Sequence, residues 1–213
     1  MRALKKQIGQ VCKRLIYKTL IPLISFCLCA SFATAAESPQ AVVQAGTDQV
    51  LKILKQYPQA THARAKQIEA VVNGYFDFEG MARLAIGQRW NSVPPEKQQE
   101  FTKDFSKLLF ATYIGDIEKY AGQKMIYNTK SVAPGYAVVE AVVNAPNGRV
   151  SLDYSLHRKN GEWKVYDVAA QGMSLAINYR SQFNSILASS SFDNLLMTLK
   201  QKIDQICRTT NRC

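Results

Sequence analysis

The stretch from Tyr136 to Ala170 constrains the fold most, because its side chains alternate as they do in β-strands. Val150 to His157 places apolar residues at every second position, which gives a strand one buried face and one solvent-facing side. Asn160-Gly161 then supplies the two residues with positive φ that a type I′ turn requires. Trp163 to Ala170 is therefore predicted to fold back as the second strand of an antiparallel hairpin.

Further strands are predicted on the N-terminal side of this hairpin. Tyr136 to Val143 is rich in β-branched residues, and Pro146-Asn147-Gly148 is predicted to close another hairpin. Lys124 to Ser131 is a plausible fourth strand. The expected sheet is antiparallel and has about four strands.

The first 36 residues are predicted to be a secretory signal peptide. The apolar run Leu20 to Phe32 is shorter than the roughly 20 residues of a membrane-spanning helix, and Ala33-Thr34-Ala35 fits a cleavage site. An uncleaved membrane anchor is the alternative. The n-region contains the six basic residues of this segment, Arg2, Lys5, Lys6, Lys13, Arg14 and Lys18. Residues 37–213 are then expected to form one domain with a sizeable core.

Charge argues against nucleic acid as a partner. The whole chain carries a net charge of +11, and because residues 1–36 contain six basic and no acidic residues, the remainder carries +5. Nucleic-acid binding usually needs a basic stripe, whereas these basic residues are dispersed among acids. The mild positive charge suits encounters with anionic lipid surfaces, and it is equally compatible with an ordinary soluble surface.

Two cysteines lie beyond the predicted signal peptide, and both are in the C-terminal tail. An oxidising compartment permits a disulfide between Cys207 and Cys213, which would anchor the tail locally. Two free or intermolecular thiols are the alternative.

Helical periodicity covers most of the remaining chain. Proline and glycine mark two of the predicted helix ends, at Pro58 and Gly87, and Ser174 is a candidate N-cap. The predicted helices are Val42–Tyr57, His62–Gly74, Phe78–Ile86, Glu96–Tyr120, a helix from Ser174 to about Ala188, and a last helix that includes Phe192 to Ile206.

The longest of these helices contains an unusual segment, Leu108 to Ile114, which is apolar on nearly all sides. Such a helix must be covered on more than one side. Either the sheet and another helix enclose it in a solid core, or one side faces an apolar cavity. From the pattern alone, the close packing of protein interiors favours the solid core.

Catalytic or metal-binding motifs are not found in the sequence. It contains no H-E-x-x-H, no G-x-S-x-G, no cluster of cysteine and histidine with metal-ligand spacing and no phosphate-binding glycine loop. His62 and His157 are interpreted as surface residues. Asp153 and Asp167 would suit acid-base chemistry if they faced each other across the hairpin, but solvated strand carboxylates are the favoured interpretation.

Several short segments together resemble the MlaC family of periplasmic phospholipid-binding proteins, also called the toluene-tolerance auxiliary family. The resemblance covers nearly all of the chain, and Met173 stands where valine is common in the family. The segments are Phe76-Asp77-Phe78, Ala85-Ile86-Gly87 with Trp90, Phe101 followed by Phe105, Tyr166-Asp167-Val168, Gly172-Met173-Ser174-Leu175 and Asn178-Tyr179-Arg180-Ser181-Gln182-Phe183.

The resemblance implies a single α+β domain, in which helices wrap a curved antiparallel sheet of about four strands with an NTF2-like or cystatin-like core and extra helices. It implies a monomeric periplasmic carrier that needs no cofactor or metal. The family holds phospholipid acyl chains in a deep pocket between sheet and helices and leaves the headgroup near the surface. It moves lipid between an outer-membrane lipoprotein-porin complex and the inner-membrane Mla ABC transporter, which maintains outer-membrane lipid asymmetry.

This resemblance reverses the preference for a solid core at the long helix, and it suggests which residues line the pocket. Each of them supplies apolar surface and none performs a reaction. The predicted ligand-binding residues are Phe105, Leu108, Leu109 and Tyr113 from the long helix, Val138, Val142, Leu152, Tyr154 and Val168 from the sheet, and Met173, Ile177 and Phe183.

Two other functions remain open at this point. The first is a small periplasmic hydrolase or isomerase that uses Asp153, Asp167 or His157. The second is an adaptor protein whose helices dock a membrane complex without carrying lipid.

Overall fold

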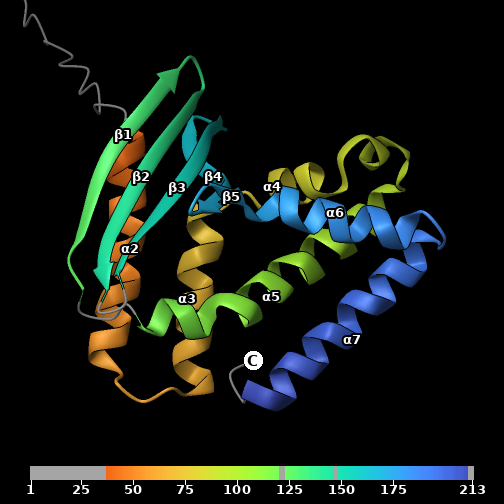
Figure 1. Cartoon of the computed structure of the whole chain (residues 1–213), viewed down its shortest axis with the longest axis horizontal. Coiled ribbons are helices and arrows are strands. Elements are labelled where there is room, and N and C mark those ends of the chain that lie inside the picture. The colour runs from red at the N-terminus through yellow and green to blue at the C-terminus, as the bar shows by residue number, and fades with distance from the viewer. Residues whose placement is uncertain (1–36, 120–122, 146–147, 211–213) are drawn as a thin grey trace, which may run out of the picture. The chain divides into compact units, whose positions relative to one another are not determined.

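The computed structural model describes residues 37–119, 123–145 and 148–210. Within these ranges the chain forms six α-helices, one 3-10 helix and a five-stranded antiparallel sheet (Figure 1), which confirms the predicted α+β class. The helices are α2 (Pro39–Gln56), α3 (His62–Tyr75), α4 (Phe78–Ile86), η1 (Gly87–Ser92), α5 (Pro95–Lys119), α6 (Leu175–Leu187) and α7 (Phe192–Thr210). The strands are β1 (Met125–Ala133), β2 (Tyr136–Ala145), β3 (Gly148–Lys159), β4 (Glu162–Ala170) and β5 (Met173–Ser174).

Local sequence signals account for most of the element boundaries. Asn160 and Gly161 have φ values of 53° and 86°, as the predicted hairpin turn requires. Ser174 caps α6, because its side chain accepts a hydrogen bond from the N–H of Ile177 at 3.1 Å. The turn residues 146–147, residues 1–36 and Cys213 lie outside the described residues. Among the described residues, no helix has the length and apolar character needed to span a membrane.

The sheet is a meander in the order β1-β2-β3-β4-β5, and each pair of neighbours is antiparallel. The fourth predicted strand is confirmed as β1. The fifth strand, β5, was not predicted, because two residues are too few to show periodicity.

A β-bulge in β4 breaks the predicted alternation. The register with β3 shifts between Ser155 and Leu156, so that Tyr166 has no partner across the ladder. Val165 and Val168 are three residues apart, yet the extra residue between them places both on the same face of the sheet. Both are buried on the side that faces the helices.

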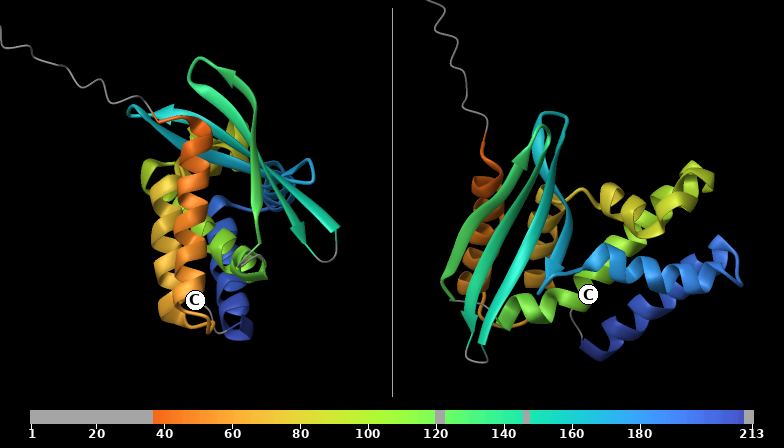
Figure 2. Two further views of the ribbon diagram at one scale, coloured as in Figure 1. Left: turned by 90° about the vertical axis from the view of Figure 1, so that its left-hand side faces the viewer. Right: turned by 45° about the horizontal axis from the view of Figure 1, so that its top comes forward.

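Helices cover one face of the sheet and extend beyond its β4 edge. Figure 2 shows the antiparallel pair α2 and α3 lying along this face, while α4, α5, α6 and α7 pack together beside β4 and β5. Three apolar clusters result. The bundle cluster belongs to α4 through α7, the sheet cluster lies between the sheet and α2, and the hairpin cluster joins α2 and α3 to α5.

Aromatic rings fill the bundle cluster. Phe105 packs edge-to-face on Tyr179 and Phe183, with ring centroids 5.2 Å and 5.5 Å apart. Phe101 contacts Phe183 in the same way at 5.4 Å. Such contacts add about 0.5–1.5 kcal/mol per pair to the effect of burial, so this cluster is a solid core.

Gly87, at the end of α4, lies against Arg180 of α6. It ends α4 with a φ of 67° and a ψ of −139°, a conformation that is essentially restricted to glycine. The guanidinium Nε of Arg180 on α6 donates a hydrogen bond to the carbonyl of Leu84 at 2.7 Å. A Cβ atom at Gly87 would lie 3.3 Å from that nitrogen.

We expect Gly87→Ala to lower the free energy of unfolding by about 1–3 kcal/mol, because alanine is strained at this φ and crowds Arg180. Gly74→Ala is the matched control. Gly74 lies near the end of α3 with open space around it, so alanine there should be neutral or stabilise by up to about 1 kcal/mol. Urea unfolding of both variants tests this, and equal effects at the two sites would contradict it.

Candidate functional site

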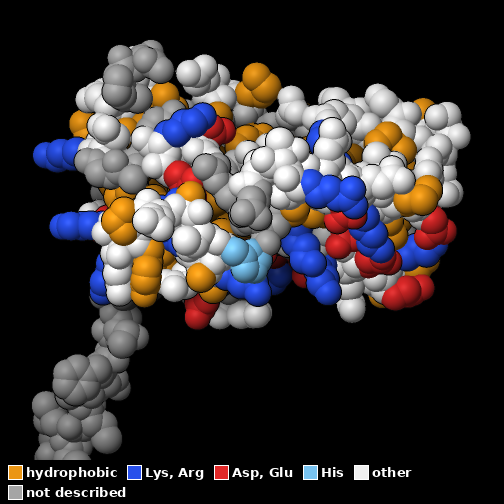
Figure 3. Space-filling model, turned by 90° about the horizontal axis from the view of Figure 1, so that it is seen from below, with side chains coloured by type: hydrophobic (Ala, Val, Ile, Leu, Met, Phe, Trp, Pro, Cys, Tyr) orange, Lys and Arg blue, Asp and Glu red, His pale blue; other side chains and the backbone are white. Residues whose placement is uncertain are grey.

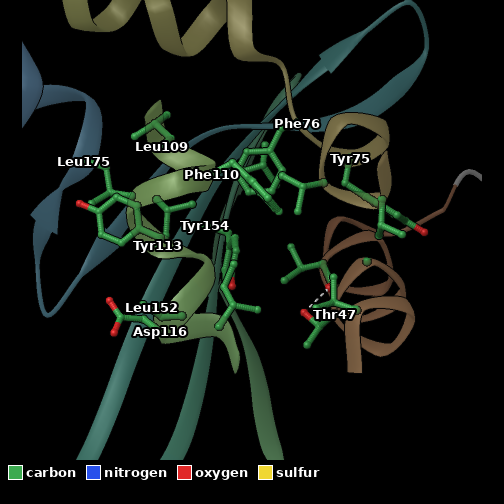
Figure 4. A pocket seen from close by; sticks show the side chains of 18 of the residues that line it. Thr47, Tyr75, Phe76, Leu109, Phe110, Tyr113, Asp116, Leu152, Tyr154 and Leu175 are labelled. Carbon is green, nitrogen blue, oxygen red and sulfur yellow. Dashed lines mark hydrogen bonds between the residues drawn. The ribbon is translucent and has the colours of Figure 1, made fainter. Parts of the chain in front are cut away.

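An apolar cavity of about 360 Å³ lies between the sheet, the α2–α3 pair and α5 (Figure 4). This volume falls within the range of small-molecule sites. Most of the lining side chains are aliphatic or aromatic. They are Val42, Val43, Gly46, Thr47, Val50, Leu51, Val71, Val72 and Tyr75 from α2 and α3, Phe76, Phe78 and Met81 around the start of α4, Leu109, Phe110, Tyr113, Asp116 and Ile117 from α5, Met125, Val150, Leu152, Tyr154, Val165, Val168 and Ala170 from the sheet, and Leu175 from α6.

The segment Leu108 to Ile114 explains why the cavity forms where it does. Leu108 packs into the bundle cluster, and Ile114 packs into the hairpin cluster on another side of the helix. Leu109 and Phe110 line the cavity, as Figure 4 shows. The sequence left open whether this segment lies in a solid core or faces an apolar cavity. The structure shows both, because two sides of the helix contact packed clusters and a third faces the cavity.

Hydroxyl groups provide most of the polarity in the lining. The hydroxyl of Thr47 donates to the backbone carbonyl of Val43 at 2.9 Å, a bond within α2. The hydroxyl of Tyr75 accepts a hydrogen bond from the side-chain amide of Gln49 at 2.7 Å. These polar groups are satisfied by the protein itself, which leaves the apolar surface to dominate the cavity.

Two tyrosines of the lining, Tyr154 and Tyr113, have a raised pKa because they are buried. Burial raises the pKa of Tyr154 to about 12, and the neighbouring Tyr127 adds to the rise. Burial also raises the pKa of Tyr113. At neutral pH neither hydroxyl carries charge, so neither is an activated nucleophile or base.

Asp116 is the one charged residue in the lining, within the part of the chain that the structure describes. Its carboxylate pairs with Lys119 at 2.8 Å, and more than half of each side chain is exposed. Asp116 therefore belongs to the open rim of the cavity, and its charge does not enter the interior.

The structure brings five of the twelve predicted site residues together in the lining: Leu109, Tyr113, Leu152, Tyr154 and Val168. The other seven lie elsewhere. Phe105, Leu108 and Phe183 are in the bundle cluster, Val138 and Val142 are on the opposite face of the sheet, and Met173 and Ile177 are 62% and 43% exposed.

The position of Val138 and Val142 follows from the register of β2. Ala141 pairs with Leu152, so the odd-numbered residues of β2 share the face of the cavity. The run from Tyr136 to Val143 is apolar at nearly every position, so its composition does not identify the buried face. Glu140 is the signal that could have done so, because the two valines share its parity and hence its face of the sheet, although Val142 is itself buried there.

The α2–α3 wall was not predicted. Val43, Val50 and Val72 lie on stripes that any amphipathic helix shows when it packs on a core. Nothing in such a stripe reveals that the space opposite is incompletely filled.

The groups considered for catalysis lie outside the lining. Asp153 pairs across the sheet with Ala169 and Asp167 with Ser155, so these two acids do not face each other across the hairpin as a carboxylate pair would. Asp153 instead forms an ion pair with Lys130 at 2.7 Å. Among the described residues, no group of three or more histidine, cysteine, aspartate or glutamate side chains is placed to hold a metal ion.

Asp167 has a structural role at the start of α6. It is buried, and its carboxylate accepts hydrogen bonds from the hydroxyl of Ser174 and, at 3.1 Å, from the N–H of Ala176. Acids at a helix N-terminus are stabilised by the helix dipole. This carboxylate therefore fixes the direction of α6.

Known proteins resemble this chain in sequence and in structure. It is 26% identical over 166 residues to the toluene tolerance protein ttg2D of Pseudomonas putida, a match that covers 75% of this chain and 77% of the relative. It is 23% identical over 206 residues to the intermembrane phospholipid transport system binding protein MlaC of Haemophilus influenzae, covering 88% and 94% of the two chains.

A solved structure shares the fold. The phospholipid-binding protein from Ralstonia solanacearum, in complex with a phospholipid, superposes with a TM-score of 0.74 at 27% identity, covering 80% of this chain and 99% of that one. The family model described as MlaC protein matches residues 44–201. These findings confirm the resemblance seen in the sequence: the chain belongs to the MlaC protein family.

Proposed function

We propose that this protein is a periplasmic phospholipid carrier that holds acyl chains in the cavity between the sheet, α2, α3 and α5. It shuttles lipid between an outer-membrane lipoprotein-porin complex and an inner-membrane ABC transporter, and so maintains the lipid asymmetry of the outer membrane. The cavity itself carries the proposal, since it lies in a chain whose structural relative is a phospholipid complex.

The lining suits hydrocarbon. Removing apolar surface from water contributes about 25 cal/mol per Å², so an acyl chain in contact with these valine, leucine and phenylalanine side chains stabilises both partners. No lysine or arginine lines the cavity in the described ranges. A phosphate would find no counter-charge inside, which supports a headgroup left at the rim.

Surface charge fits a lipid partner better than nucleic acid. On the face shown in Figure 3, basic and acidic side chains lie beside one another and form no continuous basic stripe. Lys97 pairs with Asp193 at 2.6 Å, and Lys200 pairs with Glu100 at 2.5 Å. Much of the positive charge is therefore locally compensated.

Leu152→Asp should lower the phospholipid that co-purifies with the protein at least about tenfold, because an ionised carboxylate in an apolar, ligand-filled cavity costs several kcal/mol. Lipid extraction followed by mass spectrometry measures this amount per mole of protein. Circular dichroism establishes that the variant is folded.

Ile126→Asp is the matched control for this experiment. Ile126 is also an aliphatic strand residue, but it is half exposed and pairs with Val142 on the face away from the cavity. Its lipid content should equal that of the unaltered protein. Equal lipid in a folded Leu152→Asp variant would contradict the assignment of this wall.

A second prediction concerns alkaline pH. An isolated tyrosine has a pKa of 10.0 and folding raises the pKa of Tyr154 to about 12, so between these values the unfolded chain loses the proton first. Stability therefore falls as pH rises through this window. Tyr154→Phe should remove up to about 2–3 kcal/mol of this alkaline loss of stability, measured by urea unfolding of both proteins at several pH values. If the free energy of unfolding of Tyr154→Phe had the same pH dependence as that of the unaltered protein, the phenol of Tyr154 would be hydrated and the prediction would be wrong.

A further inference from the structure

The segment Phe76-Asp77-Phe78 connects α3 to α4 along the free edge of β4. Phe76 forms an isolated parallel bridge with Val165, and the N–H of Asp77 donates to the carbonyl of Val165 at 2.8 Å. Phe76 and Phe78 both line the cavity, with their rings stacked at a centroid distance of 5.5 Å. Asp77 lies between them and contributes nothing to the lining.

The carboxylate of Asp77 makes contacts on the other side of the sheet. It accepts a hydrogen bond from Nζ of Lys159 at 2.7 Å, and it lies 2.8 Å from Nε2 of His157. Both partners are on β3 and alternate with Leu156, which is fully buried in the sheet cluster on the cavity side. The side chain of Asp77 thus ties two cavity-lining phenylalanines to the opposite face of the sheet.

This link contains a buried charge. Asp77 is 6% exposed, and burial alone would raise its pKa. Lys159, the nearby backbone N–H of Gly80 and the charge of His157 outweigh burial and lower the pKa, so the group is ionised at neutral pH. Removing one partner from a buried charge pair is strongly unfavourable, and the segment is therefore held firmly.

Gly80 is fitted to the same carboxylate. A Cβ atom there would lie 2.6 Å from Oδ2 of Asp77, a separation that forces one of the two to move. The first turn of α4 is therefore built around the side chain of Asp77, and its place along β4 depends on it.

We infer that Asp77 is a positioning residue of the cavity: its link to His157 and Lys159 holds Phe76 and Phe78 in the wall that contacts the lipid. This inference rests on the proposed function. Because energetic coupling is reciprocal, occupancy of the cavity also changes the surroundings of His157, although His157 does not line it.

The chain offers a clean spectroscopic test, since it contains only two histidines, His62 and His157. His62 begins α3 and is exposed. The protein is delipidated and then reloaded from vesicles of phosphatidylethanolamine and phosphatidylglycerol, and the imidazole NMR signals are compared at one pH. The signals of His157 should move on reloading, while those of His62 stay in place.

Variants test the same link by lipid retention. Asp77→Asn keeps the size of the side chain but removes its charge, and it should release lipid to acceptor vesicles roughly tenfold faster, since one charge-assisted hydrogen bond is lost. In this variant, reloading should no longer move the His157 signals. Gly80→Ala should act in the same direction by displacing the carboxylate.

Glu79→Gln is the matched control. Glu79 is the neighbouring acid, pairs with Lys159 at 3.3 Å and is 53% exposed, so its variant should retain lipid as the unaltered protein does.

If lipid binds but the His157 signals stay in place and Asp77→Asn retains lipid normally, the inference is overturned and the carrier function stands. If the delipidated protein takes up no lipid, the proposed function itself fails. Should Asp77→Asn not fold, the NMR comparison on the unaltered protein still decides.

Discussion

The structure depends on covering Leu108 to Ile114, about two turns of α5 that are apolar on nearly all sides. Leu108 and Ile114 are covered by two separately packed clusters, and Leu109 and Phe110 face the space left between them. Water against such surface is unfavourable by about 25 cal/mol per Å². The protein's own side chains therefore leave part of the apolar surface of this helix facing a cavity.

Secondary structure was predictable where local chemistry determines it. Phe78–Ile86 has the same bounds in the prediction and in the structure, because Gly87 can adopt the conformation that ends the helix. Asn160-Gly161 and Ser174 behaved as predicted for similar reasons. The two-residue β5, which pairs with the end of β4, is too short to show periodicity, and nothing in the alternation of the β3–β4 hairpin marks the bulge at Tyr166.

The site was less predictable than the fold. Periodicity tells which side of a helix is buried but does not distinguish a solid core from a cavity, so Phe105 and Leu109 looked alike in the sequence. In the structure both belong to the bundle cluster, but Leu109 also lines the cavity, whereas Phe105 is enclosed by aromatic rings. For β2 the sequence did not show whether the odd-numbered or the even-numbered residues face the cavity. Glu140 marks the even-numbered side as the one away from the cavity, but only once the strand pairing is known. The resemblance to the MlaC family, confirmed by the family match over residues 44–201, supplied the expectation of a cavity that composition alone did not support.

Because of its bulge, β4 directs consecutive side chains to three different places: the cavity, His157 and the start of α6. Val165 and Val168 both face the cavity, the ring of Tyr166 is tilted against that of His157 with ring centroids 5.0 Å apart, and Asp167 accepts a hydrogen bond at the start of α6. Deleting a single residue here would restore a regular ladder and turn either the valines or Asp167 to the wrong side. Length in this strand is therefore under tighter constraint than residue type, so substitutions should accumulate there much more readily than insertions or deletions.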